Sequence, residues 1–233
     1  MKYTAVIPAA GSGKRMGLEK SKLFIKLAEI PIIVRTLAVF EKDSWCDSIV
    51  LVVAAADRLE MEKLVEQYGL QKVTAIVPGG PERQHSVFAG LKAVRNSQIV
   101  VVHDGARPFI QIEKIHDVVL AAEKYGAAVP GVPVNDTIKY VHHNKVIETP
   151  ERKYLRAIQT PQAFYYDLLN DAHLAANREQ FIGTDDATLV ERIGHAVAVV
   201  PGDYLNIKIT TREDLIFARG ILHTQSRGGE DDV

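Results

Sequence analysis

The chain has 233 residues, and its 28 Lys and Arg are balanced by 29 Asp and Glu, so its formal charge near neutral pH is −1. This balance offers no basic surface for nucleic acid or another extended polyanion. Hydrophobic residues make up 47% of the sequence and charged residues 24%, which is typical of globular proteins and not of disordered chains.

The sequence also shows no membrane or export segment. The longest purely apolar run, residues 49–56, is far shorter than the roughly 18 residues that a membrane helix needs. The first residues lack the pattern of a signal peptide, so we expect a cytoplasmic protein. The length favours one domain at 1–225, and we expect the polar residues 226–233 to form a disordered tail. Cys46, the single cysteine, has no Cys or His neighbour at metal-ligand spacing and is expected to fill space in the core.

Short runs rich in Val and Ile alternate with segments of helical period through the first two thirds of the chain, which is typical of βαβ units. The predicted strands are 3–8, 48–54, 73–77, 99–103 and 127–132. The predicted helices between them are 31–41, 58–68, 86–94 and 112–125. Because these strands lack polar alternation, both of their faces should be buried between helices. The predicted fold is therefore an α/β sandwich of three layers around a mostly parallel sheet.

The last third begins with a different pattern. Two short polar strands at 137–141 and 145–149 predict a hairpin around His142-His143-Asn144, within an arm at about 135–152. A hairpin this small is marginal alone, so it either folds over the domain or packs on another subunit, and we favour the second. The rest predicts helices at 165–177, 185–193 and 211–222 and a strand at 196–200, with Thr210 or Thr211 capping the last helix.

Ligands bind beyond the carboxyl ends of the strands in such sheets, which directs attention first to the loop after the first strand. This loop, 8–16, reads PAAGSGKRM. It is not a P-loop, because Pro8 and Arg15 stand where that motif needs Gly and Ser or Thr. It is not a dinucleotide fingerprint either, because Met16 replaces the closing Gly or Ala. Its small residues still let backbone N–H groups approach a ligand. Four cations lie in or just after the loop: Lys14, Arg15, Lys20 and Lys22. The alternative is that these residues form a basic loop exposed to solvent, with no ligand.

Two further loops carry candidate binding groups. Gly79 and Gly80 precede a helix that we expect to begin near Ser86. The two glycines would allow close contact with a planar base, and the alternative is that they form an ordinary turn. Asp104 and Arg107 follow the strand at 99–103. Asp104 could hold a divalent metal or a hydroxyl, and Arg107 a phosphate, unless the two form a purely structural ion pair.

Six motifs then occur together in one order: PAAGSGKRM at 8–16, GPERQHSVFAGL at 80–91, HDGARP at 103–108, TPQ at 160–162, TDD at 184–186 and NIK at 206–208. Taken together, they resemble the 2-C-methyl-D-erythritol 4-phosphate cytidylyltransferase family of the non-mevalonate isoprenoid route, over about residues 3–222. The resemblance implies a Rossmann-like nucleotidyltransferase domain with a protruding β-arm used in dimerisation. It also implies transfer of CMP from CTP to the sugar-alcohol phosphate, with Mg²⁺ or another divalent cation.

The resemblance further implies roles for individual residues. The nucleotide would be bound by Pro8, Ala9, Ala10, Gly11, Gly13, Gly80, Ser86 and Gly105. The catalytic cations would be Arg15, Lys22 and Lys208. The second substrate would be bound by Asp104, Arg107, Thr160 and Thr184, together with Thr137 and Arg152 from a partner subunit's arm. Mg²⁺ would be held mainly by the CTP phosphates, with Asp104 as a candidate ligand.

Three alternatives accompany this interpretation. A related cytidylyltransferase acting on ribitol 5-phosphate would share the fold and CTP, but its first loop tends to read Leu-Ala-Gly-Gly. A noncatalytic nucleotide-binding module need not combine Arg15, Lys22 and Lys208. A dehydrogenase is disfavoured by Met16.

The sequence departs from the family at one position of the second motif. Some members of the family carry an acidic residue that can touch the ribose where this chain has Pro81, and Pro81 offers no such contact.

Overall fold

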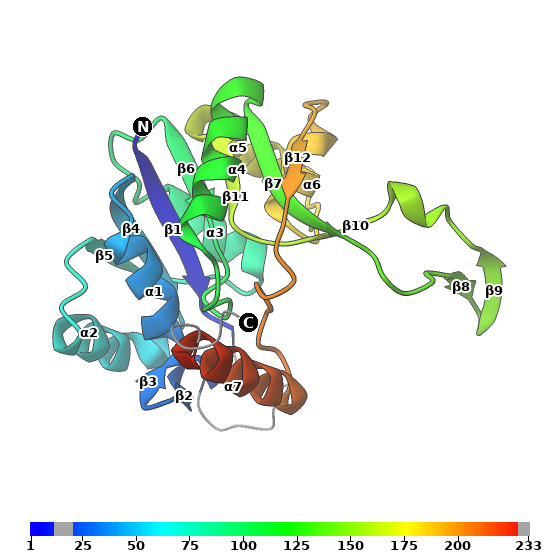
Figure 1. Ribbon diagram of the computed structural model, residues 1–233. Coiled ribbons are helices and arrows are strands. Elements are labelled where there is room, and N and C mark those ends of the chain that lie inside the picture. The colour runs from blue at the N-terminus through cyan, green and yellow to red at the C-terminus, as the bar shows by residue number, and fades with distance from the viewer. Residues whose placement is uncertain (12–20, 228–233) are drawn as a thin grey trace.

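The computed structural model describes residues 1–11 and 21–227, with only the backbone of 225–227. A mixed sheet lies at its centre (Figure 1). Its strands are β1 (Tyr3–Ala9), β4 (Cys46–Val53), β5 (Val73–Pro78), β6 (Ile99–Val102), β7 (Ala127–Pro133), β10 (Arg156–Ile158), β11 (Gln162–Tyr165) and β12 (Ala198–Pro201). They are ordered β10-β7-β11-β6-β1-β4-β5, and β12 also pairs with β7. The pairings of β4 with β1 and β5, of β6 with β1 and of β12 with β7 are parallel, as the sequence predicts.

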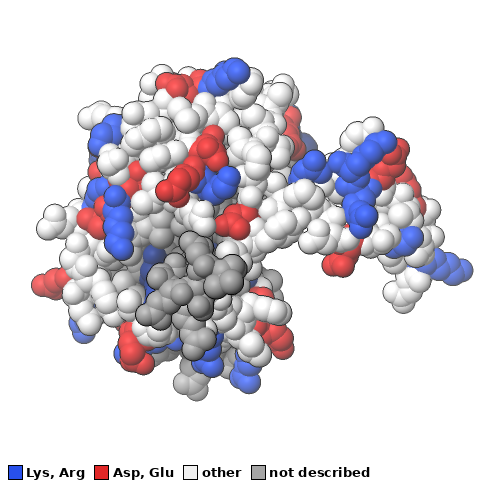
Figure 2. All heavy atoms as spheres, viewed as in Figure 1, with Lys and Arg blue, Asp and Glu red and all other residues white. Residues whose placement is uncertain are grey.

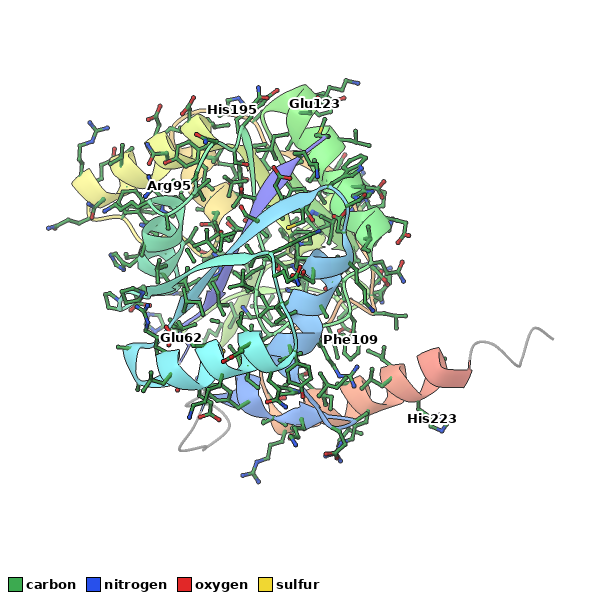
Figure 3. All side chains as sticks on the ribbon, turned by 90° about the vertical axis from the view of Figure 1, so that its left-hand side faces the viewer. Glu62, Arg95, Phe109, Glu123, His195 and His223 are labelled. Carbon is green, nitrogen blue, oxygen red and sulfur yellow. The ribbon has the colours of Figure 1, made fainter. Side chains whose placement is uncertain are left out.

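Helices cover both faces of this sheet. They are α1 (Ile32–Lys42), α2 (Arg58–Gln67), α3 (Arg83–Leu91), α4 (Ile112–Tyr125), α5 (Tyr166–Arg178), α6 (Asp186–Arg192) and α7 (Arg212–Arg227), and the short 3-10 turns are η2 (Lys22–Phe24), η3 (Ala55–Asp57) and η4 (Arg152–Tyr154). With the sheet turned edge-on, α1 and α4 lie on one side and α3 and α5 on the other (Figure 3). The predicted α/β sandwich of three layers is therefore confirmed.

Alternate side chains of β1 explain why the sheet needs both layers. Ile7 belongs to the core that packs under α1 and α4, together with Leu37 and Val118. Val6, one residue earlier, points to the opposite face and joins the core under α3 and α5 with Leu91. Because neighbouring side chains of a strand face opposite sides, an apolar residue at each position requires two covering layers.

The antiparallel strands β10 and β11 were not predicted. β11 lies between β6 and β7 and runs antiparallel to both. It has only four residues and begins with Gln162, so it lacks the long Val- and Ile-rich run that marks the other central strands. Gln162 is nevertheless buried, and its amide donates to Asp185 Oδ2 at 2.7 Å.

The ends of two helices also differ from the prediction. α3 begins at Arg83 and not near Ser86. α7 begins at Arg212, so Thr211 stands at the predicted cap position, and the Asp214 carboxylate accepts bonds from Thr210 and from the Thr211 N–H. α7 continues to residue 227, two residues into the segment predicted as a tail at 226–233, and residues 228–233 lie outside the described part.

Two two-stranded sheets stand apart from the central one. One joins β2 (Lys26–Leu27) to β3 (Ile30–Pro31). The other is the predicted hairpin, formed by β8 (Tyr140–His142) and β9 (Lys145–Glu148), with His143 and Asn144 at positive φ in its turn. Every residue of β8 and β9 is exposed, and the hairpin extends away from the central sheet instead of folding over it (Figure 1). Among the described helices, none combines the length and apolar character needed to cross a membrane.

Gly90 fixes how closely α3 approaches the sheet. A Cβ atom at this position would lie 2.6 Å from Val6 Cγ1 and 2.8 Å from Val52 Cγ2. Both valines are fully buried side chains of β1 and β4, so they have little room to move. The helix can therefore pack at this distance only with glycine at position 90.

We predict opposite effects for the same substitution at two helical glycines. Gly90→Ala should lower the free energy of unfolding by about 1 to 2 kcal/mol, because the added methyl group overpacks the core. Gly220→Ala in α7, where the new Cβ meets no atom of the described chain within 4 Å, should raise it by up to about 1 kcal/mol through helix propensity. Urea unfolding of both variants checks this, and a Gly90→Ala protein as stable as the parent would contradict the packing argument.

Candidate active site

A cavity of about 550 Å³ opens at the carboxyl ends of β1 and β6, beside the start of α3. It brings together many of the predicted site residues: Pro8, Ala9, Ala10, Gly11, Lys22, Gly80, Ser86, Asp104, Gly105 and Lys208. Pro81, Glu82 and Arg83 also line it. The predicted residues Gly13 and Arg15 lie outside the described part of the chain.

The small residues of the first two loops set the width of this cavity. A Cβ at Gly79 would lie 2.4 Å from Ala10 Cβ and 2.8 Å from Ser86 Oγ, so a larger residue would push the loops apart. The Gly80 N–H donates to Ser86 Oγ at 3.1 Å, which ties the glycine turn to the first turn of α3. The two loops therefore form one wall with few side chains, as expected for a surface that meets a flat base or a sugar.

Asp104 is the most heavily bonded group of the site. Its Oδ1 accepts from Arg83 Nε at 3.0 Å, and its Oδ2 lies 2.7 Å from Lys208 Nζ. Its backbone N–H donates to Thr160 Oγ1 at 3.0 Å. Burial alone would raise the pKa of Asp104, but the charges of Arg83 and Lys208 outweigh it, and the pKa lies well below its usual range. The carboxylate is therefore ionised at neutral pH.

The predicted pairing of Asp104 with Arg107 is present but is the longest of these contacts, at 3.8 Å between Nε and Oδ2. Arg107 instead donates from Nη1 to the carbonyl oxygen of Asn206 at 2.6 Å. The motifs predict Lys208 near the second substrate with Asp104, and they count Arg83 among the basic residues around the cleft. They give Arg83 no individual role, and its contact with Asp104 is not apparent from the GPERQHSVFAGL motif alone.

A buried histidine orders the hydroxyl of Thr160. His103 is fully buried, and this burial lowers its pKa to about 4, so the ring is neutral near pH 7 and carries one N–H. Its Nε2 faces the Arg107 carbonyl oxygen at 3.0 Å and must donate there, which leaves Nδ1 to accept from Thr160 Oγ1 at 3.1 Å. The Thr160 hydroxyl thus donates to His103 and accepts from Asp104, and its predicted contact with a substrate stays a prediction.

The segment that carries Lys208 is bonded to both neighbouring loops. The Asn206 amide donates to the Thr160 carbonyl oxygen at 2.8 Å, and the Ile209 N–H donates to the Ala106 carbonyl oxygen at 2.9 Å. These bonds hold residues 206–209 against the loop after β6. They place the Lys208 ammonium group in the cavity beside Asp104.

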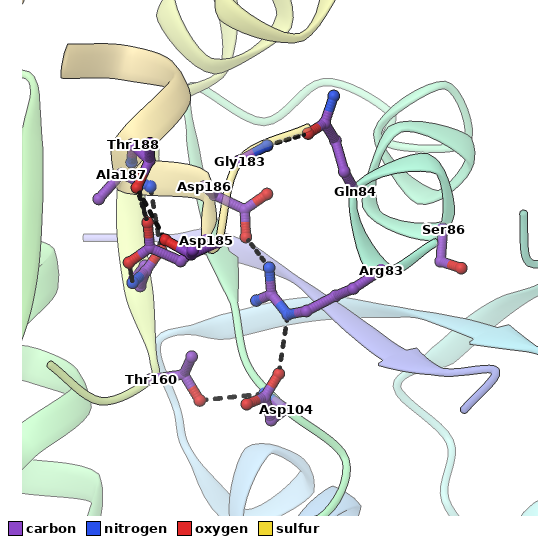
Figure 4. Close-up of polar contacts among 12 residues, drawn as sticks. Arg83, Gln84, Ser86, Asp104, Thr160, Gly183, Asp185, Asp186, Ala187 and Thr188 are labelled. Carbon is purple, nitrogen blue, oxygen red and sulfur yellow. Dashed lines mark hydrogen bonds and ion pairs between the residues drawn. The ribbon is translucent and has the colours of Figure 1, made fainter. Parts of the chain in front are cut away.

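Arg83 also reaches a second, deeper carboxylate (Figure 4). Its Nη1 donates to Asp186 Oδ2 at 2.7 Å, and Asp186 Oδ1 lies 3.1 Å from His173 Nε2. Asp186 opens α6 and is buried together with His173. Burial would raise the pKa of Asp186, but Arg83 and the hydrogen bond from His173 outweigh it, and the pKa is lowered.

The remaining predicted substrate residues lie elsewhere in the single chain. Thr137 and Arg152 are exposed in the segments that lead to and from the hairpin, and Arg152 donates to the Asn135 carbonyl oxygen at 2.7 Å. Thr184 lines a different cavity of about 460 Å³ between β7, α6 and β12. These three residues are not brought to the Asp104 cavity within one chain.

The described residues offer little to hold a metal ion by themselves. They contain no group of three or more His, Cys, Asp or Glu that could form a metal site. Glu82 and Asp104 are the acidic residues among those that line the cavity, and both oxygens of Asp104 already face cations. Mg²⁺ is commonly held by one or two carboxylates plus substrate phosphates, so this donor set fits an ion that arrives mainly on a triphosphate.

The chain is similar to known proteins over nearly its whole length. Residues 3–224 match the sequence profile described as IspD, 2-C-methyl-D-erythritol 4-phosphate cytidylyltransferase. The protein of that name from Bacillus cytotoxicus is 51% identical over 225 residues, which are 97% of this chain and 100% of that protein. Its namesake from Geobacillus kaustophilus is 52% identical over 222 residues, which are 95% of this chain and 97% of that protein.

Solved structures share the fold. The crystal structure of 4-diphosphocytidyl-2C-methyl-D-erythritol synthase from Anaerococcus prevotii matches with a TM-score of 0.84 at 35% identity, covering 95% of this chain and 96% of that one. The 2-C-methyl-D-erythritol 4-phosphate cytidylyltransferase of Thermus thermophilus matches with a TM-score of 0.80 at 32% identity, covering 96% and 100%. With the profile match, these relatives show that the chain belongs to the 2-C-methyl-D-erythritol 4-phosphate cytidylyltransferase family.

Proposed function

We propose that this chain transfers CMP from CTP to 2-C-methyl-D-erythritol 4-phosphate and releases pyrophosphate. The product is 4-diphosphocytidyl-2-C-methyl-D-erythritol, an intermediate of isoprenoid precursor synthesis in the non-mevalonate route. The observation that carries the proposal is the cavity itself, where a wall of small residues meets Lys22, Arg83 and Lys208 around Asp104. Membership of the cytidylyltransferase family supports it.

The small-residue wall would bind the nucleoside part of CTP. Ala9, Ala10, Gly80 and Ser86 would face the base, and the neighbouring Pro8, Gly11, Gly13 and Gly105 would complete the nucleotide site. A Cβ at Gly105 would lie 2.9 Å from Ile33 Cδ1, so the loop after β6 already packs tightly against α1. Recognition by backbone groups needs such close packing, because a base is discriminated only when the surrounding donors and acceptors cannot move away.

The cations would act on the reacting phosphates. A phosphate oxygen of the second substrate forms a bond to the α-phosphorus of CTP, and the bond between that phosphorus and the oxygen bridging to the β-phosphate breaks, releasing pyrophosphate. Such transfers depend mainly on positioning and on stabilising negative charge, which Arg15, Lys22 and Lys208 would supply. No general base is needed, because the attacking phosphate, with a second pKa of about 6, is already largely ionised. A divalent cation, when bound, would neutralise charge on the CTP phosphates.

The second substrate would bind beside Asp104 and Arg107, near Thr160. Thr137 and Arg152 would reach it from the arm of a partner subunit, because both lie on the projecting hairpin segments of their own chain. The hairpin exposes apolar side chains that a dimer would cover: Tyr140, Val141, Val146 and Ile147. Lys and Arg side chains also gather on the arm, which suits contact with a phosphorylated substrate (Figure 2). We therefore propose a cytoplasmic homodimer with active sites shared between subunits.

The substrate pair is the first prediction of this proposal. Pyrophosphate release from CTP should require both a divalent cation such as Mg²⁺ and 2-C-methyl-D-erythritol 4-phosphate. A coupled pyrophosphate assay on the purified chain measures this, with ribitol 5-phosphate and each single omission as controls. Faster release with ribitol 5-phosphate would overturn the choice of substrate, and CTP binding without turnover would indicate a noncatalytic nucleotide-binding protein.

Sharing of sites between subunits is a separate prediction. Lys22→Ala and Arg152→Ala chains should each be nearly inactive as homodimers. After mixing in equal amounts with subunit exchange, half of the dimers are mixed, and each holds one intact site, so activity should recover to about a quarter of the parent value. The control is a mixture of Lys22→Ala and Lys114→Ala chains. Because the Lys114→Ala homodimer keeps both of its sites intact, this mixture should be active without any subunit exchange. Exchange proven by mass spectrometry without recovery in the first mixture would contradict shared sites.

A further inference from the structure

Arg83 holds two buried carboxylates that come from distant parts of the chain. Its Nε donates to Asp104 in the loop after β6, at 3.0 Å, and its Nη1 donates to Asp186 at the start of α6, at 2.7 Å. Figure 4 shows the guanidinium group between them. A lysine could not make this arrangement, because its single ammonium group lacks the fixed fork of donors.

The inner carboxylate is anchored from behind. His173 in α5 donates from Nε2 to Asp186 Oδ1 at 3.1 Å, and both side chains are only 1% exposed. The His173 ring stacks on Phe88 with the centroids 5.5 Å apart and the planes 2° from parallel. Phe88 belongs to α3, the helix that Arg83 begins, so three helices meet at this cluster. Asp186 is therefore a fixed point from which Arg83 extends toward the cavity.

Charge explains why Arg83 is hard to replace. Burial disfavours its charged form, but the charges of Asp186 and Asp104 outweigh that cost, and the pKa of Arg83 is raised. Without Arg83, Asp186 would keep His173 as its described partner, and Asp104 would keep Lys208 and the more distant Arg107. Lys208, already 2.7 Å from Asp104 Oδ2, would then be the main cation neutralising that carboxylate and would be less available to a phosphate.

The contacts of Arg83 also link two regions assigned to the second substrate. Asp104 lies in one, and Asp186 lies two residues after Thr184 in the other. By contrast, the wall proposed for cytosine is closed by bonds that do not involve Arg83, such as Gly80 N–H to Ser86 Oγ. A disturbance at Arg83 should therefore reach the second substrate and the reacting phosphates before it reaches the base.

We propose that Arg83, anchored by Asp186 and His173, is a positioning residue that fixes Asp104 and Lys208 for the transfer step and aligns them with the start of α6. This inference rests on the proposed function. The competing possibility is that Arg83 binds CTP directly through Nη2, a buried nitrogen without a hydrogen-bond partner in the described part of the chain. The two differ in which substrate responds when the anchor is removed.

Asp186→Asn is the central variant, because Asp186 is too deeply buried to touch either substrate. We expect it to lower kcat about tenfold or more, the scale of a misplaced catalytic group, and to raise KM for the sugar-alcohol phosphate. The Kd of Mg-CTP, measured by calorimetry, should change less than about threefold. Arg83→Lys should lower kcat as much as Arg83→Gln does. The double variant, Arg83→Gln with Asp186→Asn, should have a kcat no lower than that of Arg83→Gln alone.

The matched control is Arg58→Gln, which removes an Arg Nε to carboxylate bond of 2.8 Å to Glu62 on exposed α2. It should leave kcat, KM and Kd within about twofold of the parent. Urea unfolding of each variant separates loss of fold from loss of positioning, and Arg83→Lys, which keeps the charge, serves if Asp186→Asn does not fold. Folded Asp186→Asn or Arg83→Lys enzyme with parental kcat would overturn the proposal, as would a Mg-CTP Kd that weakens as much as kcat falls.

A readout independent of turnover separates this inference from the proposed function. The Arg83 Nε–H resonance in ¹H–¹⁵N spectra, assigned by its loss in Arg83→Lys, should shift in Asp186→Asn and His173→Asn and stay in place in Arg58→Gln. An unchanged resonance would show that the anchor does not act on Arg83. If the parent and Arg58→Gln proteins themselves fail to turn over the two substrates, the proposed function fails, whereas the resonance still decides whether Arg83 is anchored.

Discussion

The site depends on one buried carboxylate, Asp104, and on the donors that surround it. A buried charge is stable only when its hydrogen-bonding capacity is met by well-placed partners, since its desolvation costs several kcal/mol. Here Arg83 and Lys208 meet the two oxygens, and the backbone N–H of the same residue is fixed by Thr160. These partners come from α3, from the segment before α7 and from the turn before β11. Asp104 therefore joins parts of the chain that are far apart in sequence into one cavity.

The same arrangement resolves the apparent conflict between a formal charge of −1 and a triphosphate substrate. The overall balance excludes an extended polyanion, which needs a broad basic surface. A small nucleotide needs only a local excess of positive charge. Lys22, Arg83 and Lys208 line one cavity with two acidic residues, Glu82 and Asp104, so cations outnumber acids there although the whole chain has one more acidic than basic residue. Figure 2 shows both signs of charge distributed over the visible face.

Elements defined by local pattern were predictable from the sequence, and elements defined by distant partners were not. Strands such as β4 and β6 are continuous Val- and Ile-rich runs, so their existence and burial follow from composition. β11 was missed because four residues beginning with Gln162 form a strand only when β6 and β7 lie on either side. In the site, the motifs named most cavity residues. The contact between Arg83 and Asp186 spans 103 positions, and no local pattern predicts it.

The charge of Asp104 holds Arg83 and Lys208 in place, and the crystal structure of an Asp104→Asn variant provides the test. Asparagine keeps the shape of the side chain and removes its charge. We predict that Lys208 Nζ moves beyond about 3.5 Å, the limit of a hydrogen bond, from the side chain at position 104. Arg83 should keep its bond to Asp186 and give up the one to position 104. If both cations stay where they are, the shape of the side chain at position 104 and not its charge holds them in place.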